Sequence, residues 1–358
     1  MPQVKKTPNP TRSEAIHEGA THDLLPQHVY NTNDADRFED LPQAVDDTDI
    51  DRPSRPKHVN FHGRRHYVWN GQISLLPIDG NEAGRLEALH DLIYAKALGD
   101  RLHLTPLDTL SGEIQILDVA YSLGIWTQWM AMTYGSARVV GIDIEAVGDY
   151  WNRRDLFPNC EVMSPVDYNE PVWGSLQLGS FDFIHVDSAS ARVADWAAFH
   201  RASMRYLKPG TGKVELVMLD LMPRPIDGSS YPPEAEPMRW WYDDLMAATQ
   251  KLGLPIAYRE DTGELLQSAG YVDVTQTTIG IPLCDTRGFA RDARLASALR
   301  AAMGDRNFHP HQSMSMSAFT QAFTDTPERY PPGRVWDVCD RVTDIVTHGV
   351  RIPIYFNL

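Results

Sequence analysis

Between residues 114 and 219, short apolar runs alternate with stretches of helical spacing, and this alternation limits the fold more than any other feature of the chain. Runs typical of buried strands cover 114–120, 137–144, 160–164, 181–187 and 213–219, and helical stretches cover 126–134 and 191–207. Strands separated by helices need crossover connections, which make neighbouring strands parallel and place helices on both faces of the sheet. The sequence therefore predicts a three-layer α/β domain with a mostly parallel sheet.

The composition changes near residue 58, and the change divides the chain. Residues 1–57 are rich in proline and acidic residues, as in NDADRFEDLPQAVDDTDIDRP, and show no sustained apolar period. A segment with so little apolar surface cannot offset the entropy that it would lose on ordering. We predict a disordered arm over 1–57, either a solvated tail or a docking segment, and a folded domain over 58–358.

Charge and cysteine content exclude several classes of protein. A formal net charge of -15 at pH 7 argues against direct binding to nucleic acid, which needs clustered Lys and Arg. The three cysteines, Cys160, Cys284 and Cys339, form neither a zinc motif nor a disulfide framework, which indicates a reducing compartment. No apolar run is long enough for a membrane span, and the N-terminus lacks the apolar segment of a secretory signal. We therefore expect a soluble protein of the cytoplasm or nucleus that is neither secreted nor bound to a membrane.

The stretch ILDVAYSLGIWTQW, residues 116–129, is a candidate ligand-binding loop because it follows the first predicted strand. Open parallel sheets bind ligands beside such a loop, where glycines let the backbone approach a cofactor. Ala120 and Ser122 stand where glycines are expected, and only Gly124 remains. Asp143 follows Gly124 by about twenty residues, the spacing at which an acid accepts ribose hydroxyls. Two interpretations stay open: a cofactor site, or a structural turn capped by Ser122.

This loop resembles motif I of class I S-adenosylmethionine-dependent methyltransferases, and in particular that of the LaeA-like methyltransferases of filamentous fungi. Four further stretches support the resemblance in the same order: LLPIDGNEAGRLEALH, NCEVMSPVDYNEPVW, SFDFIHVDSASARVADWAAFHRASMRYLKPG and EPMRWWYDDLMAATQKLGLPIA. The similarity runs from about Tyr67 to the C-terminus.

The resemblance implies a Rossmann-like sheet of about seven strands whose last strand is antiparallel. RIPIYFNL can supply that strand, after a helical stripe of Val335, Val338, Val342 and Ile345, although Pro353 removes one ladder donor and predicts a bulge. Helical insertions at about 223–260 and 284–333 are implied as a lid over the substrate side.

The cofactor implied by the resemblance is S-adenosyl-L-methionine, with S-adenosyl-L-homocysteine as product. The implied pocket consists of Asp118, Ala120, Tyr121, Ser122, Gly124, Asp143, Ile144, Asp167 and Tyr168. Asp143 would hold the ribose, and Asp167 would face the adenine ring. Family members usually carry glycine at the positions of Ala120 and Ser122. The methyl group of Ala120 can be accommodated and Ser122 can donate a hydrogen bond, whereas Tyr121 adds bulk, so both a working pocket and one of reduced or lost cofactor affinity stay open.

Methyl transfer from a sulfonium is an in-line displacement with a neutral leaving group, so positioning supplies most of the catalysis and no base is required. If a base acts, His185 and Asp187, at the end of the fourth predicted strand, are the candidates. His185 has an alternative interpretation as a hydrogen-bonded structural histidine, and Asp187 as the cap of the following helix.

The aromatic run Trp240, Trp241 and Tyr242 would suit a flat apolar substrate if it lies on a lid helix. Core packing of the same helix explains the run at least as well. His309 and His311 flank a proline without a third ligand nearby, so no metal site is predicted.

Three functions can be compared with these observations. The first is an active LaeA-like methyltransferase of fungal secondary metabolism, acting on an aromatic natural product or as an accessory factor of a pathway. The second is a regulatory subunit of weak or no activity that works through protein partners, as in velvet-type complexes. The third, a nicotinamide-dependent dehydrogenase, is disfavoured because the loop lacks the early glycines that pyrophosphate contact needs. The sequence leaves open the methyl acceptor and whether the chain forms a homo-oligomer.

Overall fold

The computed structural model describes residues 56–107, 113–145, 156–187, 189, 191–225, 230–256, 259–283, 294–299, 310–323, 337, 341–342, 345 and 354–358. All of these belong to one of the two units of the chain, Thr48–Leu358, and the other unit is Met1–Asp47. Several predictions lie outside the described residues: the acidic arm up to residue 55, Cys284, Cys339, His309, the side chain of His311, Val335, Val338 and Pro353.

The central sheet contains five strands in the order β6-β5-β4-β7-β8, and all neighbouring strands pair in parallel. They are β4 (Gln115–Val119), β5 (Arg138–Ile142), β6 (Cys160–Met163), β7 (Phe183–Asp187) and β8 (Lys213–Val217). The predicted parallel sheet is thus confirmed. Because the chain runs outward from β4 to β6 and then returns to β7, the topological switch point lies between β4 and β7.

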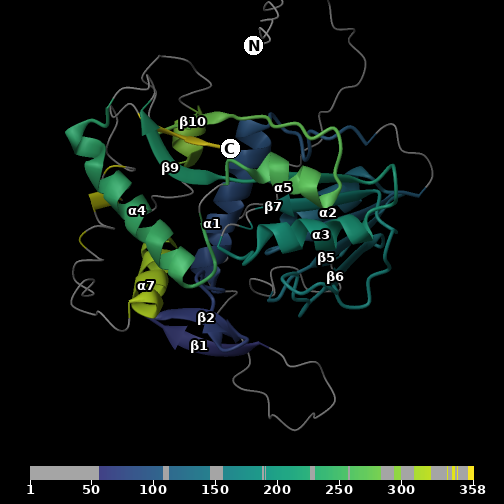
Figure 1. Cartoon of the computed structure of the whole chain (residues 1–358), viewed down its shortest axis with the longest axis horizontal. Coiled ribbons are helices and arrows are strands. Elements are labelled where there is room, and N and C mark those ends of the chain that lie inside the picture. Colours follow the sequence, from purple (N-terminus) through teal and green to yellow (C-terminus); the bar gives the residue numbers. More distant parts are fainter. Residues whose placement is uncertain are drawn as a thin grey trace, which may run out of the picture. The chain divides into compact units, whose positions relative to one another are not determined.

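Helices cover the central sheet on its two faces (Figure 1). In β4, Ile116 belongs to one apolar cluster together with Trp126, whereas Leu117 belongs to the opposite cluster together with Phe199. The two helices concerned are α2 (Ile125–Thr133) and α3 (Trp196–Tyr206). Side chains that alternate between two cores are typical of a strand buried on both sides. The observed fold is therefore the predicted three-layer Rossmann-like sandwich.

A long helical segment precedes β4 in the chain. It consists of α1 (Gly80–His90) and a π-helical continuation, η2 (Asp91–Ala97). The stripe of apolar residues predicted from the sequence is buried, with members Leu86, Leu89, Ile93 and Ala97. Asp79 caps α1 by accepting the backbone N–H of Glu82 at 3.1 Å. Because α1 packs against α2, its side chains come close to the loop that follows β4.

An antiparallel sheet that is not predicted from the sequence lies before α1. Its strands are β1 (Lys57–Phe61), β2 (Arg64–Trp69) and β3 (Gln72–Ile73). The run RRHYVW lacks a regular alternation of apolar and polar residues, so its period carries no strand signal. Lys57, assigned above to the arm, is the first residue of β1.

The last strand belongs to a second antiparallel sheet with the order β10-β11-β9. These strands are β9 (Asp220–Pro225), β10 (Gly280–Pro282) and β11 (Ile354–Asn357). β11 is antiparallel as expected, but it pairs with β9 and β10, so the expected single sheet is divided in two. The division follows from the interruption between Val217 and Asp220, and from prolines in β9 that offer no N–H to a longer ladder.

The insertion after β9 packs as part of the core. Its helices are η4 (Pro233–Ala235) and α4 (Glu236–Lys251), followed by α5 (Thr262–Ala269) and, later, α7 (Pro310–Ala322). α4 packs against α7 and β9, and Leu245 of α4 joins the same apolar cluster as Ile116. The role of this region as a substrate lid stays a prediction. None of the described helices is long and apolar enough to cross a membrane.

Candidate functional site

The loop after β4 adopts backbone angles that glycine usually supplies. Ala120 (φ 63°), Ser122 (φ 53°) and Gly124 (φ 73°) all lie in the left-handed region. An L-residue with a side chain pays about 1–2 kcal/mol for this conformation, and glycine does not. The loop therefore keeps the shape of a glycine-rich loop, although only one of the three residues is glycine.

The side chains of this loop are accommodated locally. Ser122 does not cap α2, because the N-cap is Gly124 and makes no side-chain hydrogen bond. The Tyr121 ring packs on Gly141 of β5, where an added Cβ would lie 3.0 Å from the ring. The interpretation of the loop as a turn capped by Ser122 is therefore wrong, and a glycine in the neighbouring strand makes room for Tyr121.

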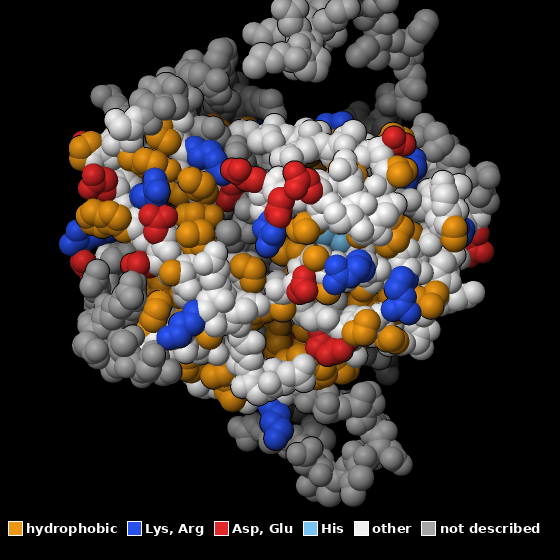
Figure 2. Space-filling view, viewed as in Figure 1, with side chains coloured by type: hydrophobic (Ala, Val, Ile, Leu, Met, Phe, Trp, Pro, Cys, Tyr) orange, Lys and Arg blue, Asp and Glu red, His pale blue; other side chains and the backbone are white. Residues whose placement is uncertain are grey.

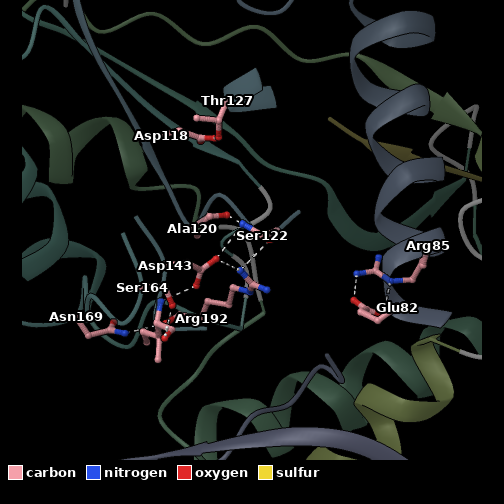
Figure 3. A network of polar contacts seen from close by, with 11 residues as sticks. Glu82, Arg85, Asp118, Ala120, Ser122, Thr127, Asp143, Ser164, Asn169 and Arg192 are labelled. Carbon is pink, nitrogen blue, oxygen red and sulfur yellow. Dashed lines mark hydrogen bonds and ion pairs between the residues drawn. The ribbon is translucent and has the colours of Figure 1, made fainter. Parts of the chain in front are cut away.

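Asp143 follows β5 and lies beside this loop (Figure 3). Its buried carboxylate accepts the backbone N–H groups of Ser122 at 2.9 Å and of Ile144 at 2.8 Å, and Nη1 of Arg192 at 3.2 Å. Burial raises the pKa of Asp143, while Arg192 and backbone donors oppose that rise. The acid predicted to hold a ribose is thus next to the loop, but it is already paired with an arginine.

Arg192 reaches Asp143 from the segment between β7 and α3. Its Nη1 also donates to Ser122 Oγ at 3.0 Å, and its side chain is only 9% exposed. The amide of Asn169 holds the backbone of this segment by donating to Arg192 O at 3.0 Å and accepting from Ala194 N at 2.8 Å. Arg192 is missed by the sequence prediction because an isolated arginine between a strand and a helix carries no motif.

Asp167, the second predicted acid, is also bound by protein groups. It accepts the indole N–H of Trp69 at 2.6 Å and the backbone N–H of Asn169 at 2.9 Å. Tyr168 is buried, and among the described residues its hydroxyl has no hydrogen-bond partner. This hydroxyl lies within electrostatic range of Asp143 and Asp167. It is an exception to the rule that buried polar atoms are hydrogen-bonded, and Tyr168 lines neither of the two cavities described below.

A buried chain of hydrogen bonds connects β4, β7 and η2. His185 Nδ1 lies 3.2 Å from Asp118 Oδ1, and His185 Nε2 lies 3.0 Å from the hydroxyl of Tyr94. That hydroxyl donates to Asp187 at 2.9 Å, and Asp118 also accepts the hydroxyl of Thr127 at 2.6 Å. Burial raises the pKa of Tyr94 well above its ordinary value, so the phenol keeps its proton. The phenol has one proton, so it can donate to Asp187 or to Nε2 of His185 but not to both, and the tautomer of His185 decides the direction of that second bond.

The two predicted base candidates differ in what they can reach. His185 is fully buried and stacks on Trp126 with ring centroids 3.7 Å apart, and both of its nitrogens face protein partners. This arrangement is that of a structural histidine. Asp187 lines a small cavity beside the loop, and it does not cap α3, whose N-cap is Asp195. A catalytic role stays a prediction for both residues, and the geometry favours Asp187.

The cavity beside the loop has a volume of about 50 Å³. Its walls come from α1, the loop and the end of β7, and include Leu86, His90, Ser122 and Asp187. Burial lowers the pKa of His90 to about 3, so this histidine is uncharged at neutral pH. Ligand pockets commonly hold about 300–1,000 Å³. Polar groups of the predicted cofactor site therefore lie beside a cavity that is smaller than a usual ligand pocket.

A larger cavity of about 1320 Å³ lies elsewhere in the described part of the chain. It is lined by β8, α5 and residues 271–279, and neither the loop after β4 nor Asp143 contributes to it. It follows the line along which the central sheet and the second sheet separate. Its size therefore reflects the divided sheet and does not identify the reactive site.

The aromatic run in α4 is divided by the helix. Trp241 and Tyr242 are buried, and the indole of Trp241 donates to Ser315 Oγ at 2.8 Å, whereas Trp240 is 55% exposed. Core packing therefore accounts for Trp241 and Tyr242, and of the three only Trp240 is available to a partner. Among the described residues no group of three or more His, Cys, Asp or Glu is arranged to hold a metal ion.

The strand order, the left-handed loop after β4 and the acid after β5 define a Rossmann-like domain of the class I methyltransferase type. No family model matches the chain. The chain is 33% identical over 231 residues to the secondary metabolism regulator LAE1 of Cochliobolus heterostrophus, covering 64% of this chain and 72% of that protein. The chain belongs to the LaeA/LAE1 family of secondary metabolism regulators, which confirms the resemblance seen in the sequence.

Other similar proteins include both regulators and enzymes. Over 273 residues the chain is 28% identical to the protein-methionine methyltransferase laeA of Emericella nidulans, covering 75% of this chain and 68% of that protein. A solved structure of phosphoethanolamine N-methyltransferase 2 from Haemonchus contortus, in complex with S-adenosyl-L-methionine, is similar with a TM-score of 0.43 and 12% identity. That similarity covers 82% of this chain and 60% of the other.

Proposed function

We propose that this protein is an S-adenosyl-L-methionine-dependent methyltransferase of fungal secondary metabolism, acting in the cytoplasm or nucleus, with its cofactor at the loop after β4. The observation that supports this most is the loop backbone. Ala120 and Ser122 keep left-handed angles at an energetic cost, and the N–H of Ser122 binds Asp143 at 2.9 Å. Strained backbone of this kind is concentrated at ligand-binding and active sites.

The polar groups of the site suit this cofactor. Asp143 would supply a carboxylate for the ribose hydroxyls, and the hydroxyl of Tyr168, which has no hydrogen-bond partner among the described residues, would supply a polar contact near Asp167 on the adenine side. Asp118 of β4 accepts the hydroxyl of Thr127 in α2 and lies beside His185 of β7, so it connects the elements that flank the loop. When bound, the cofactor supplies a methyl group on a sulfonium with a neutral leaving group.

The methyl acceptor that we favour is the thioether of a protein methionine, as in the relative named a protein-methionine methyltransferase. A thioether has no proton to lose, so the reaction needs no base. This agrees with a His185 whose nitrogens are both bound within the protein. The carboxylate of Asp187 at the cavity would stabilise the positive charge that the acceptor sulfur gains.

A regulatory subunit with weak or no activity is the second candidate, and two observations favour it. The cavity beside the loop holds about 50 Å³, and Arg192 pairs with the acid that a cofactor would use. Such a protein would act through protein partners. The two candidates differ in one property, which is the transfer of a methyl group.

Methyl transfer can be tested with S-adenosylmethionine labelled in its methyl group. The purified protein is incubated with a methionine-containing peptide, with the same peptide carrying norleucine in place of methionine, and with a catechol. Label on the methionine peptide alone is the expected result. Label on the catechol alone would indicate a small aromatic substrate. Cofactor binding without label on any acceptor, the methionine peptide included, would favour the regulatory subunit.

A further inference from the structure

The carboxylate of Asp143 has too few free acceptor sites for the two hydroxyls of a ribose. A carboxylate offers about four such sites. Three are used, by the backbone N–H groups of Ser122 and Ile144 and by Nη1 of Arg192. A ribose that binds through two hydroxyls therefore has to displace a donor. The backbone donors belong to the loop and to the chain after β5, so Arg192 is the donor that a side-chain movement can remove.

Ser122 gives Arg192 a second partner that a glycine would lack. Nη1 of Arg192 lies 3.0 Å from Ser122 Oγ and 3.2 Å from Asp143 Oδ2, so one nitrogen bridges the loop and the acid (Figure 3). The departure of residue 122 from glycine and the position of Arg192 are therefore parts of one contact. This contact closes the ribose side of the site.

The backbone of the segment that carries Arg192 is held separately from its guanidinium, which binds Asp143 and Ser122 among the described residues. Asn169 binds the backbone on both sides of Val193, at Arg192 O and Ala194 N. Release of the guanidinium would leave the buried Asp143 carboxylate without a counter-ion, which is costly unless another donor takes its place. Release of Arg192 is therefore coupled to the arrival of a ligand that donates hydrogen bonds to Asp143.

We infer that Arg192 is a gate residue, which closes the cofactor site by bridging Asp143 and Ser122 and has to leave both for a nucleoside to bind. The inference rests on the proposed function, and it names the residue that sets cofactor affinity in this chain. A closed gate lowers the apparent affinity by the fraction of molecules in which it is open. If the closed position of Arg192 is favoured over the open one by about 1–2 kcal/mol, the apparent affinity falls about five- to thirty-fold.

The test is isothermal titration of the full chain with S-adenosylhomocysteine. Arg192→Met keeps the apolar stem and removes the guanidinium, and it is expected to tighten binding about five- to thirty-fold. Ser122→Ala removes one of the two acceptors, so it is expected to tighten binding by a smaller factor. Arg201→Met, an exposed arginine of α3, is the matched control and is expected to bind as the unaltered protein does.

Two further variants separate the position of the Arg192 side chain from its charge. Asn169→Ala loosens the segment that carries Arg192 and is expected to tighten binding without touching the charge pair. Arg192→Lys keeps a positive charge but lacks the planar guanidinium group. Its affinity for S-adenosylhomocysteine is expected to lie between those of Arg192→Met and the unaltered protein. Thermal unfolding of each variant confirms that it is folded.

Several results would overturn the gate. Binding that is unchanged or weaker in folded Arg192→Met, while the unaltered protein binds, would show that Arg192 does not compete with the ligand and would leave the cofactor assignment intact. Tighter binding of adenosine 2′-monophosphate than of adenosine, lost in Arg192→Met, would make Arg192 a phosphate ligand. Absence of binding in every folded variant, Arg192→Met included, would reject the cofactor assignment and the gate together.

Discussion

Ala120 lies in the candidate cofactor loop and has a strained backbone conformation. Its φ of 63° is a conformation that glycine adopts freely. Ala120→Gly should raise the free energy of unfolding by about 1 kcal/mol, because relief of left-handed strain exceeds the entropy that a glycine adds to the unfolded chain. Urea unfolding measures this change.

The matched control is Ala247→Gly, which places the same substitution at an exposed position of α4. There the substitution should destabilise by about 1 kcal/mol, the ordinary cost of glycine within a helix. A loss of stability at both positions would mean that the loop is relaxed with alanine and that its shape is no sign of strain.

The place of a residue in the site could be predicted where the residue belongs to a sequence motif. It could not be predicted where the residue reaches the site only through tertiary packing. The spacing of Asp143 from Gly124 predicts an acid beside the loop, and the backbone N–H of Ser122 in the loop binds that acid at 2.9 Å. Tyr94 and Arg192 carry no local pattern, and they reach the site only because η2 and the segment after β7 pack against it. The binding roles of the loop residues stay predictions.

At the scale of elements, α4 separates two neighbouring tryptophans by their burial. Trp241 is fully buried and donates to Ser315, and Trp240 is 55% exposed. Trp241→Ala should cost about 3–5 kcal/mol of unfolding free energy, because it leaves a large cavity. Trp240→Ala should change it by less than about 0.5 kcal/mol. Equal effects of the two substitutions, measured by denaturant unfolding, would contradict this packing of α4.

Strands buried on both faces were predictable because apolar runs flanked by turns carry a clear signal, as β4, β5 and β7 show. The sheet formed by β1 to β3 was not, because its strands carry polar residues on both faces. The division of the C-terminal strands into a second sheet was also missed. Which strands pair depends on contacts between residues far apart in the chain, and the local sequence of β9, which begins at Asp220, does not indicate its partner.

For the whole molecule, two buried histidines contribute to the loss of stability in acid. Burial lowers the pKa of His200 from 6.5 to about 4, and that of His90 from 6.5 to about 3. Between these values and 6.5 the unfolded chain binds more protons than the folded one, so stability is complete above about pH 6.5 and falls as the pH falls. The nitrogens of His200 also have no hydrogen-bond partner among the described residues.

His200→Leu should therefore remove part of the acid sensitivity. Relative to the unaltered protein, the variant should gain about 2 kcal/mol more at about pH 5 than at about pH 8. His200→Gln separates titration from polarity, because it should remove the same pH dependence while it keeps a buried polar group. Parallel stability curves for His200→Leu and the unaltered protein would show that His200 does not titrate in the folded state below its ordinary range.

The measurement that tests the central claim most directly is isothermal titration with S-adenosyl-L-methionine of the unaltered protein and of Asp143→Ala. The account predicts saturable binding that Asp143→Ala weakens by about 1.5–3 kcal/mol, the contribution of hydrogen bonds to a charged group. Asp261→Ala, at the start of α5 and away from the loop, should bind as the unaltered protein does. Binding with equal affinity in Asp143→Ala would place the cofactor elsewhere, and absence of binding in the folded, unaltered protein and in folded Arg192→Met would contradict the assignment of this loop as a cofactor site.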